Sequence, residues 1–332
     1  MSIPVEQVHL PGQIKIPTLS RKAREGWGTL NIPFDPEYTP GAFNAVNVCL
    51  RIQPSEQVCL ITDEATIEIA AAIARELEKI GATYHAWVLE ELAERPLTDL
   101  PRPILDDLEG SQVSIFAVKV QTHELRSRIQ MTDVVNRRKI RHAHMVNINR
   151  QIMLEGMRAD FARVDRLSQK VVEMVRKASK IRAKTAAGTD LTADLNPNYK
   201  WLKTSGIISP EKWGNLPGGE IFTTPGEVNG TFVIDGVVGD YLCAKFGDLK
   251  DTPLTISMKG NRLVEAHSQN RELESDFWKY THTDENNDRI DKFTIGTNID
   301  LKEVIRQILQ DKKYPNVHIT FRNPYGAHTR TN

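Results

Sequence analysis

The sequence predicts an α/β N-terminal domain with a parallel sheet, followed by an α+β, mainly antiparallel C-terminal domain. In the first half, apolar strand-like runs alternate with helical patterns, which is typical of a parallel sheet covered by helices. Beyond about residue 190, strand-like segments follow one another with Gly and Asn-Gly turn signals. The length of 332 residues suits two domains of about 150 residues each.

The first half opens with a strand and a helix whose ends are marked in the sequence. The run "QVCLITD" (57–63) predicts a buried strand, and Asp63 at its end predicts a helix N-cap. Apolar residues then recur at helical spacing until Gly81, which predicts the end of the helix. Further strands are predicted at 83–89, 111–120 and 141–148, with helical stretches between them.

A long helix is predicted at 153–178, with a buried stripe at helical spacing, and a turn follows at "AGTD" (187–190). The pattern then becomes strand-like in "GTFVIDGVVGDYL", "PLTISMKGNRLVEA" and "NVHITF". Together these patterns predict an extended arm at 1–40, the α/β domain at 41–188 and the α+β domain, which carries the candidate metal site, at 189–332.

Composition narrows the class of protein. Lys plus Arg and Asp plus Glu both number 43, so the formal net charge is zero. This balance argues against a nucleic-acid or anionic-membrane binder, which needs an excess of basic residues. The three cysteines are widely spaced, and we find neither a signal peptide nor an apolar run of about 18 residues. We therefore expect a cytoplasmic protein.

Glu220 is the first candidate site residue. It lies in "NLPGGEIFTTPGEVNGTF" (215–232), between a glycine pair and an apolar "IF". A carboxylate in such a setting is expensive to desolvate unless it is hydrogen-bonded, paired or bound to a metal. Spacing alone leaves two interpretations open, a structural glutamate that accepts backbone N–H bonds and a ligand or base held in one geometry.

Two more candidates lie near the end of the chain. His318 is in the alternating run "NVHITF", and Tyr325 follows a turn-like "RNP". Each also has an ordinary interpretation as a packed side chain. The basic run "RRKIRHAH" (137–144) fits a solvated helix end before a strand, and "HTDENND" (282–288) fits a solvated loop because it lacks the Gly and Glu of an EF-hand. We find no GxGxxG after the first strand and no GxxxxGK[ST], HExxH or GxSxG motif.

The order of these pieces resembles the aminopeptidase T family of thermophilic leucyl aminopeptidases, which use two metal ions. "NLPGGEIFTTPGEVNGTFVIDG" matches that family's signature, and "AAGTDLT", "DRIDKFTIGTN" and "QDKKYPNVHITFRNPYG" follow the family order. The resemblance implies metal ligands at Glu220 and His318 and an active-site tyrosine at Tyr325. It also implies zinc, cobalt or manganese as cofactor, a short peptide substrate and a homodimer. The first 40 or so residues are not covered by it.

Two departures alter the metal site that this resemblance implies. Lys292 stands where the family has a second glutamate ligand, and the family's closing His-x-Asp pair is not reached before Asn332. A charged lysine cannot ligate a metal, so we expect an impaired peptidase and a Lys292–Glu220 contact near ~3 Å in its place. Two alternatives remain. One is a catalytically degenerate homologue acting as a binding or oligomeric partner, and the other is a non-haem iron ring-cleaving dioxygenase of the dihydroxypyridine type, whose sequences resemble this family.

Overall fold

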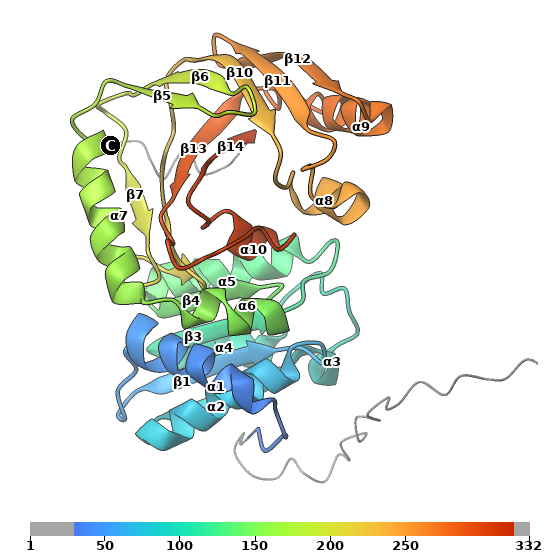
Figure 1. The fold of residues 1–332 in the computed structure, drawn as a ribbon. Coiled ribbons are helices and arrows are strands. Elements are labelled where there is room, and N and C mark those ends of the chain that lie inside the picture. Colours follow the sequence, from blue (N-terminus) through green and yellow to red (C-terminus); the bar gives the residue numbers. More distant parts are fainter. Residues whose placement is uncertain (1–29, 322–332) are drawn as a thin grey trace, which may run out of the picture.

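The computed structural model describes residues 30–321, and Figure 1 shows their arrangement. The lower part of Figure 1 is a sheet with helices on both faces, and the upper part is an antiparallel sheet with α8 (Asp240–Phe246) and α9 (Arg271–Thr281) beside it. Strands β13 (Ile290–Gly296) and β14 (Val317–Phe321) and helix α10 (Ile308–Asp311) lie between these two parts. The predicted fold class is confirmed.

The lower sheet is wholly parallel, in the order β2-β1-β3-β4-β8. Its strands are β1 (Gln57–Thr62), β2 (Thr83–Val88), β3 (Val113–Val118), β4 (Arg141–Val146) and the short β8 (Gly214–Asn215). Two apolar clusters pack against it, one containing residues of α1 and α2 and the other residues of α4 and α5. This division explains why β3 is buried at every position, since both of its faces are covered.

The helices of this part are short or of medium length. They are α1 (Thr39–Phe43), α2 (Ile67–Ile80), α3 (Leu89–Leu92), α4 (Arg102–Gly110), α5 (Leu125–Arg138) and α6 (Arg150–Leu154). Gly81 ends α2 in the left-handed conformation, as predicted. The N-cap prediction was wrong by three residues, because Thr66 precedes the helix while the Asp63 carboxylate accepts hydrogen bonds from the Thr66 backbone and hydroxyl.

The predicted helix at 153–178 is divided in the structure. Helix α6 ends at Leu154, a single 3₁₀ turn covers Gly156–Arg158, and α7 runs over Phe161–Val175. Asp160 caps α7 by accepting a hydrogen bond from the Arg163 backbone. At the break, the Gly156 N–H donates a hydrogen bond of 3.0 Å to Gln310 Oε1, and an added Cβ would lie 2.4 Å from the same oxygen, so a larger residue would displace the Gln310 side chain.

The second half forms two antiparallel sheets. The first has the order β12-β11-β10-β6-β5, and the second has the order β14-β13-β9-β7. Their strands are β5 (Lys180–Lys184), β6 (Asp190–Asp194), β7 (Leu202–Thr204), β9 (Glu220–Thr223), β10 (Val228–Ile234), β11 (Leu254–Lys259), β12 (Arg262–Ser268), β13 (Ile290–Gly296) and β14 (Val317–Phe321). The accompanying helices are α8 (Asp240–Phe246), α9 (Arg271–Thr281) and α10 (Ile308–Asp311). The domain boundaries at residues 40 and 188 stay predictions.

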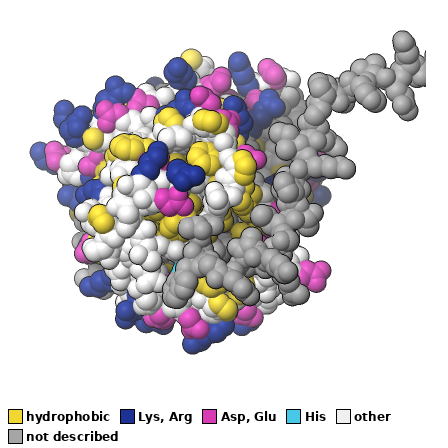
Figure 2. Space-filling view, turned by 90° about the horizontal axis from the view of Figure 1, so that it is seen from below, with side chains coloured by type: hydrophobic (Ala, Val, Ile, Leu, Met, Phe, Trp, Pro, Cys, Tyr) yellow, Lys and Arg dark blue, Asp and Glu magenta, His cyan; other side chains and the backbone are white. Residues whose placement is uncertain are grey.

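One face of the molecule shows both signs of charge, in agreement with the neutral composition. On the face shown in Figure 2, Lys and Arg side chains alternate with Asp and Glu, and apolar side chains lie among them. Across residues 30–321, no helix is both long and apolar enough to span a membrane.

Candidate functional site

Glu220 begins β9, and the glycine pair before it explains its cramped setting. An added Cβ at Gly218 would lie 2.1 Å from the Gly206 backbone nitrogen. Gly219 has φ +125°, a conformation that favours glycine, and a Cβ there would lie 2.5 Å from Asn298 Cβ. The loop is therefore pressed between two other segments and delivers Glu220 to the sheet with 2% of its surface exposed.

The nearest charged partner of Glu220 is Lys313. Its Nζ lies 2.5 Å from Glu220 Oε1, and the lysine is fully buried. Lys313 lies two residues after α10 and is fixed by its backbone, since its N–H donates to the Gln310 carbonyl and its own carbonyl accepts from the Asn298 N–H. Sequence reasoning missed this residue because "DKKY" looks like an ordinary solvated pair of lysines before a strand.

Lys292 and His318 complete the contacts around the carboxylate. Lys292 Nζ lies 3.9 Å from Glu220 Oε1, a longer distance than the ~3 Å expected from the sequence. The same ammonium lies 3.8 Å from the centre of the Phe222 ring, where a cation–π interaction holds it. His318 Nε2 lies 3.5 Å from Glu220 Oε2. The two candidates Glu220 and His318, 98 residues apart, are therefore neighbours.

Sheet register explains this convergence. Thr294 of β13 faces Phe222 of β9 and His318 of β14, while Gly296 faces Glu220. Alternate residues of a strand point to the same face, so these side chains share one face of the sheet. Tyr325, the third candidate, lies outside the described residues.

Burial and charge act against each other at this centre. Burial alone would raise the pKa of Glu220, but the charges of Lys313 and Lys292 outweigh it and hold that pKa well below its usual value. Burial lowers the pKa of Lys313 to about 7, although Glu220 opposes the shift. Burial also lowers the pKa of Lys292 and, more than Glu220 can offset, that of His318.

A further lysine stands close enough to take part in this electrostatic network. Burial lowers the pKa of Lys212 to about 8, and Lys203 and Lys292 contribute by repulsion while Glu220 opposes them. The Lys212 ammonium donates a hydrogen bond to the Lys203 carbonyl. The ammonium groups of Lys292 and Lys313 thus contact one carboxylate, and the Lys212 ammonium adds to the positive charge in its neighbourhood.

These residues do not fit a metal centre. Metal sites of the predicted kinds need three or more His or carboxylate ligands. Within residues 30–321, no three His, Cys, Asp or Glu side chains form such a group. Glu220 and His318 offer two ligands, but the Lys313 ammonium already contacts the carboxylate. A protonated lysine has no lone pair to donate and repels a cation.

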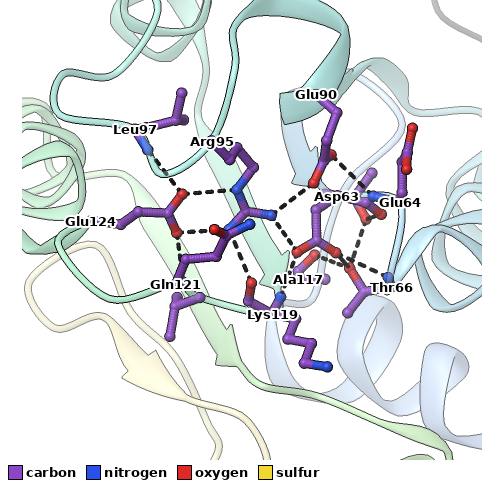
Figure 3. Close-up of polar contacts among 12 residues, drawn as sticks. Asp63, Glu64, Thr66, Glu90, Arg95, Leu97, Ala117, Lys119, Gln121 and Glu124 are labelled. Atoms are coloured by element: carbon purple, nitrogen blue, oxygen red, sulfur yellow. Dashed lines mark hydrogen bonds and ion pairs between the residues drawn. The ribbon is translucent and has the colours of Figure 1, made fainter.

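A second polar cluster lies where the order of the parallel sheet changes, between the ends of β1 and β3 (Figure 3). Such points often bind ligands in α/β folds. Here Arg95 fills the position, with contacts of 2.7 Å to Asp63, 2.9 Å to Glu90 and 2.7 Å to Glu124. Burial raises the pKa of Glu124, but hydrogen bonds from Arg95 and from backbone amides bring it below its usual value.

The carboxylates around Arg95 have further partners. Asp63 accepts from the Lys119 backbone, and Glu124 accepts from the Leu97 and Gln121 backbones. The cluster thus joins β1, β3 and the loop before α4, and we interpret it as structural.

The basic run 137–144 begins as the predicted helix end, because Arg137 and Arg138 lie in the last turn of α5. Its two histidines are buried instead of solvated. Ser114 Oγ lies 2.8 Å from His142 Nδ1, and His142 Nε2 lies 3.0 Å from His144 Nδ1. Burial lowers the pKa of His142 to about 3 and that of His144 well below its usual value.

Comparison with known proteins identifies the family of this chain. A model of the family described as NicX: 2,5-dihydroxypyridine 5,6-dioxygenase matches residues 40–279. The chain belongs to this family. The match contains Glu220 but ends before Lys292, Lys313 and His318. No curated protein matches the chain.

Two solved structures have the same fold at low sequence identity. The 2,5-dihydroxypyridine dioxygenase from Pseudomonas putida KT2440 has a TM-score of 0.61 at 15% identity, covering 89% of this chain and 88% of the other. Wild-type AmpT from Thermus thermophilus has a TM-score of 0.62 at 13% identity, covering 87% and 86%. The predicted likeness to aminopeptidase T thus holds for the fold, while the family is that of the dioxygenase.

Proposed function

We propose that this chain is a catalytically degenerate member of the dihydroxypyridine dioxygenase family that binds a small molecule at the Glu220 centre. The observation that carries the proposal is the Lys313 ammonium 2.5 Å from Glu220 Oε1, with Lys292 at 3.9 Å. The predicted aminopeptidase is supported by likeness of fold alone. The family match supports the alternatives over it.

A lysine ammonium beside Glu220 strongly repels a divalent metal ion. A divalent ion about 4 Å from one ammonium is repelled by about 8 kcal/mol at an effective dielectric of 20. Since about 1.4 kcal/mol changes an equilibrium constant tenfold, even a fraction of this repulsion removes useful affinity. Burial lowers the pKa of Lys313 to about 7 although Glu220 opposes the shift, so the repulsion from Lys313 is greatest below pH 7 and weakens as its ammonium deprotonates above it.

The test combines metal analysis with two activity assays on the full chain. We expect less than one tenth of an equivalent of iron, zinc, cobalt or manganese per purified chain. We also expect no oxygen uptake with 2,5-dihydroxypyridine after supply of Fe(II), and no cleavage of a leucine anilide after supply of zinc, cobalt or manganese. Stoichiometric metal with turnover in either assay would overturn the proposal.

The second candidate is the iron-dependent ring-cleaving dioxygenase, which the family match favours. It requires two histidines and one carboxylate around iron. Glu220 and His318 supply one of each in the described part of the chain. Oxygen uptake that depends on both Fe(II) and 2,5-dihydroxypyridine, and that His318→Ala abolishes, would establish this candidate in place of the first.

The predicted homodimer and cytoplasmic location are also proposals. All three cysteines, Cys49, Cys59 and Cys243, are free, which suits a reducing compartment. A stable dimer should bury more than about 1,200 Å² in total. Light scattering at micromolar concentration should give twice the chain mass of 37.5 kDa, and a monomer mass would contradict the dimer.

A further inference from the structure

We propose that the segment 297–316, which joins β13 to β14, is a lid held down by Gln310, and that this attachment keeps Lys313 against Glu220. The inference rests on the proposed function, because it concerns how the Glu220 centre is kept closed. It makes Gln310 a positioning residue, since its side chain acts on Glu220 only through Lys313.

The lid is a long excursion between two neighbouring strands. Its base is closed by the strand pair, since Ile295 faces Val317 and the Gly296 N–H donates to the Asn316 carbonyl. Between these points the chain forms one short helix, α10. Connections of this length with so little regular structure are uncommon in compact domains and usually have a function, as active-site lids do.

One side of the lid docks beside the end of α6, on the half of the molecule that contains the parallel sheet. Gln310 is fully buried, and its Oε1 accepts a hydrogen bond of 3.0 Å from the Gly156 N–H. Its Nε2 donates a hydrogen bond of 3.0 Å to Glu155 Oε2, while Glu155 Oε1 accepts from the Lys302 N–H of the lid. We call these three hydrogen bonds the latch.

Other contacts of the docked lid are few. Asp300 accepts a hydrogen bond of 2.8 Å from the Asp160 N–H and pairs with Arg163. Ile305 and Leu309 pack in the apolar cluster that contains residues of α1 and α2. A helix as short as α10 is not stable in water by itself, so the lid depends on docking for its conformation.

The other side of the lid reaches the Glu220 centre through Lys313. The Lys313 N–H donates to the Gln310 carbonyl at 2.8 Å, so the latch and the lysine belong to one turn of the chain. Asn298 donates its N–H to the Lys313 carbonyl and its Nδ2 to the carbonyl of Gly218, two residues before Glu220. The Lys313 side chain is thereby held fully buried, with Nζ 2.5 Å from Glu220 Oε1. Release of the latch removes the support for this position and uncovers the carboxylate.

The rate at which Lys313 is acylated in the full chain by an N-hydroxysuccinimide ester of acetic acid tests this inference. Tandem mass spectrometry of the peptides resolves each lysine, and the exposed Lys259 is the internal reference. Relative to Lys259, Lys313 should react at least ten times faster in Gln310→Ala and in Glu155→Ala than in the unmodified chain. Each variant removes two of the three latch hydrogen bonds, and a tenfold change needs about 1.4 kcal/mol, which two hydrogen bonds supply.

A double variant and a control separate the latch from a general loss of stability. Glu155→Gln/Gln310→Glu exchanges donor and acceptor but keeps every latch hydrogen bond, so it should return the Lys313 rate to within about threefold of the unmodified chain. Gln130→Ala is the matched control, because Gln130 also accepts from a backbone N–H and donates to a carboxylate, that of Asp99. It should leave the Lys313 rate unchanged.

Equally slow acylation of Lys313 in Gln310→Ala, Glu155→Ala and the unmodified chain would overturn the inference. Equal acceleration in Gln130→Ala, or no slowing in the double variant, would do the same. Glu155→Ala leaves the lid's own residues unchanged and keeps the test valid if Gln310→Ala fails to fold. Acylation needs no metal, so stoichiometric metal in the unmodified chain would overturn the proposed function, whereas equal rates in all variants would overturn only the latch.

Discussion

Replacing Lys313 by methionine should destabilise the protein more than the same replacement at Lys292. The two ammonium groups lie 2.5 Å and 3.9 Å from Glu220 Oε1. At an effective dielectric of 20, these distances give gross attractions of about 7 and about 4 kcal/mol. Methionine nearly preserves the volume of the lysine stem, so lost charge dominates the change.

The net effect is smaller than the gross attraction, since each ammonium is also relieved of its desolvation. Removing one partner of a buried pair reduces the free energy of unfolding by roughly 3–5 kcal/mol. We expect Lys313→Met to fall in this range and Lys292→Met to lose roughly half as much, because Lys292 is the more distant and more exposed partner.

Urea unfolding, followed by both tryptophan fluorescence and far-ultraviolet circular dichroism, measures these changes where the two probes coincide. The double variant Glu220→Gln/Lys313→Met removes both charges and should recover at least half of the loss. A loss below about 1 kcal/mol for Lys313→Met, or additive effects in the double variant, would refute the reasoning that this pair is a coupled buried contact.

Three further predictions concern other parts of the fold. His142 binds a proton near pH 6.5 when unfolded but only near pH 3 when folded, so the unfolded state holds more protons between these values. The free energy of unfolding should therefore fall by about 2 kcal/mol from His142 alone between pH 7 and pH 5, with a shallower fall in His142→Gln, and equal slopes would contradict this. Gly219→Ala should lower the free energy of unfolding by more than about 2 kcal/mol, measured by urea unfolding, because the new Cβ meets Asn298. Gly110→Ala should have little effect, because nothing lies within 4 Å of a Cβ at that position. Similar losses in the two variants would count against this packing explanation. Arg95→Met should lower the free energy of unfolding by at least about 3 kcal/mol, because it leaves Asp63 and Glu124 buried without their cation. Arg102→Met, the control, should leave the urea midpoint nearly unchanged because Arg102 is exposed. An Arg95→Met variant as stable as the unmodified chain would show that the cluster is not structural.

Local patterns in the sequence predicted the parallel half well. The strand at 57–62 and the end of helix α2 at Gly81 depend on residues within a few positions of each other, so distant parts of the chain do not change them. The break at Gly156 was not predicted, and the side chain that accepts a hydrogen bond from the Gly156 N–H, that of Gln310, lies 154 positions away in the sequence. Apolar residues continue at helical spacing beyond the break, so the sequence predicted one helix where the structure has two.

The candidate site was predicted in part. Glu220 was suggested by its setting and His318 by its place in an alternating apolar run, the resemblance implied both as ligands, and the register of β9, β13 and β14 brings them together. Lys313 was missed, since a lysine beside another lysine gives no signal of burial. Lys292 was correctly expected near Glu220, but its distance depends on Phe222 and Lys313, which no local pattern places.

The central claim is that the lysines at positions 292 and 313 exclude a metal from the Glu220 centre. Calorimetric titration of Fe(II), under anaerobic conditions, and of Zn(II) into the full chain and into Lys292→Glu/Lys313→Met tests it most directly. The account predicts no binding tighter than about 1 mM in the unmodified chain and an affinity at least a hundredfold higher in the double variant, since about 2.7 kcal/mol of repulsion is enough for that change. Stoichiometric micromolar binding of either metal to the unmodified chain, with no gain in the double variant, would contradict it.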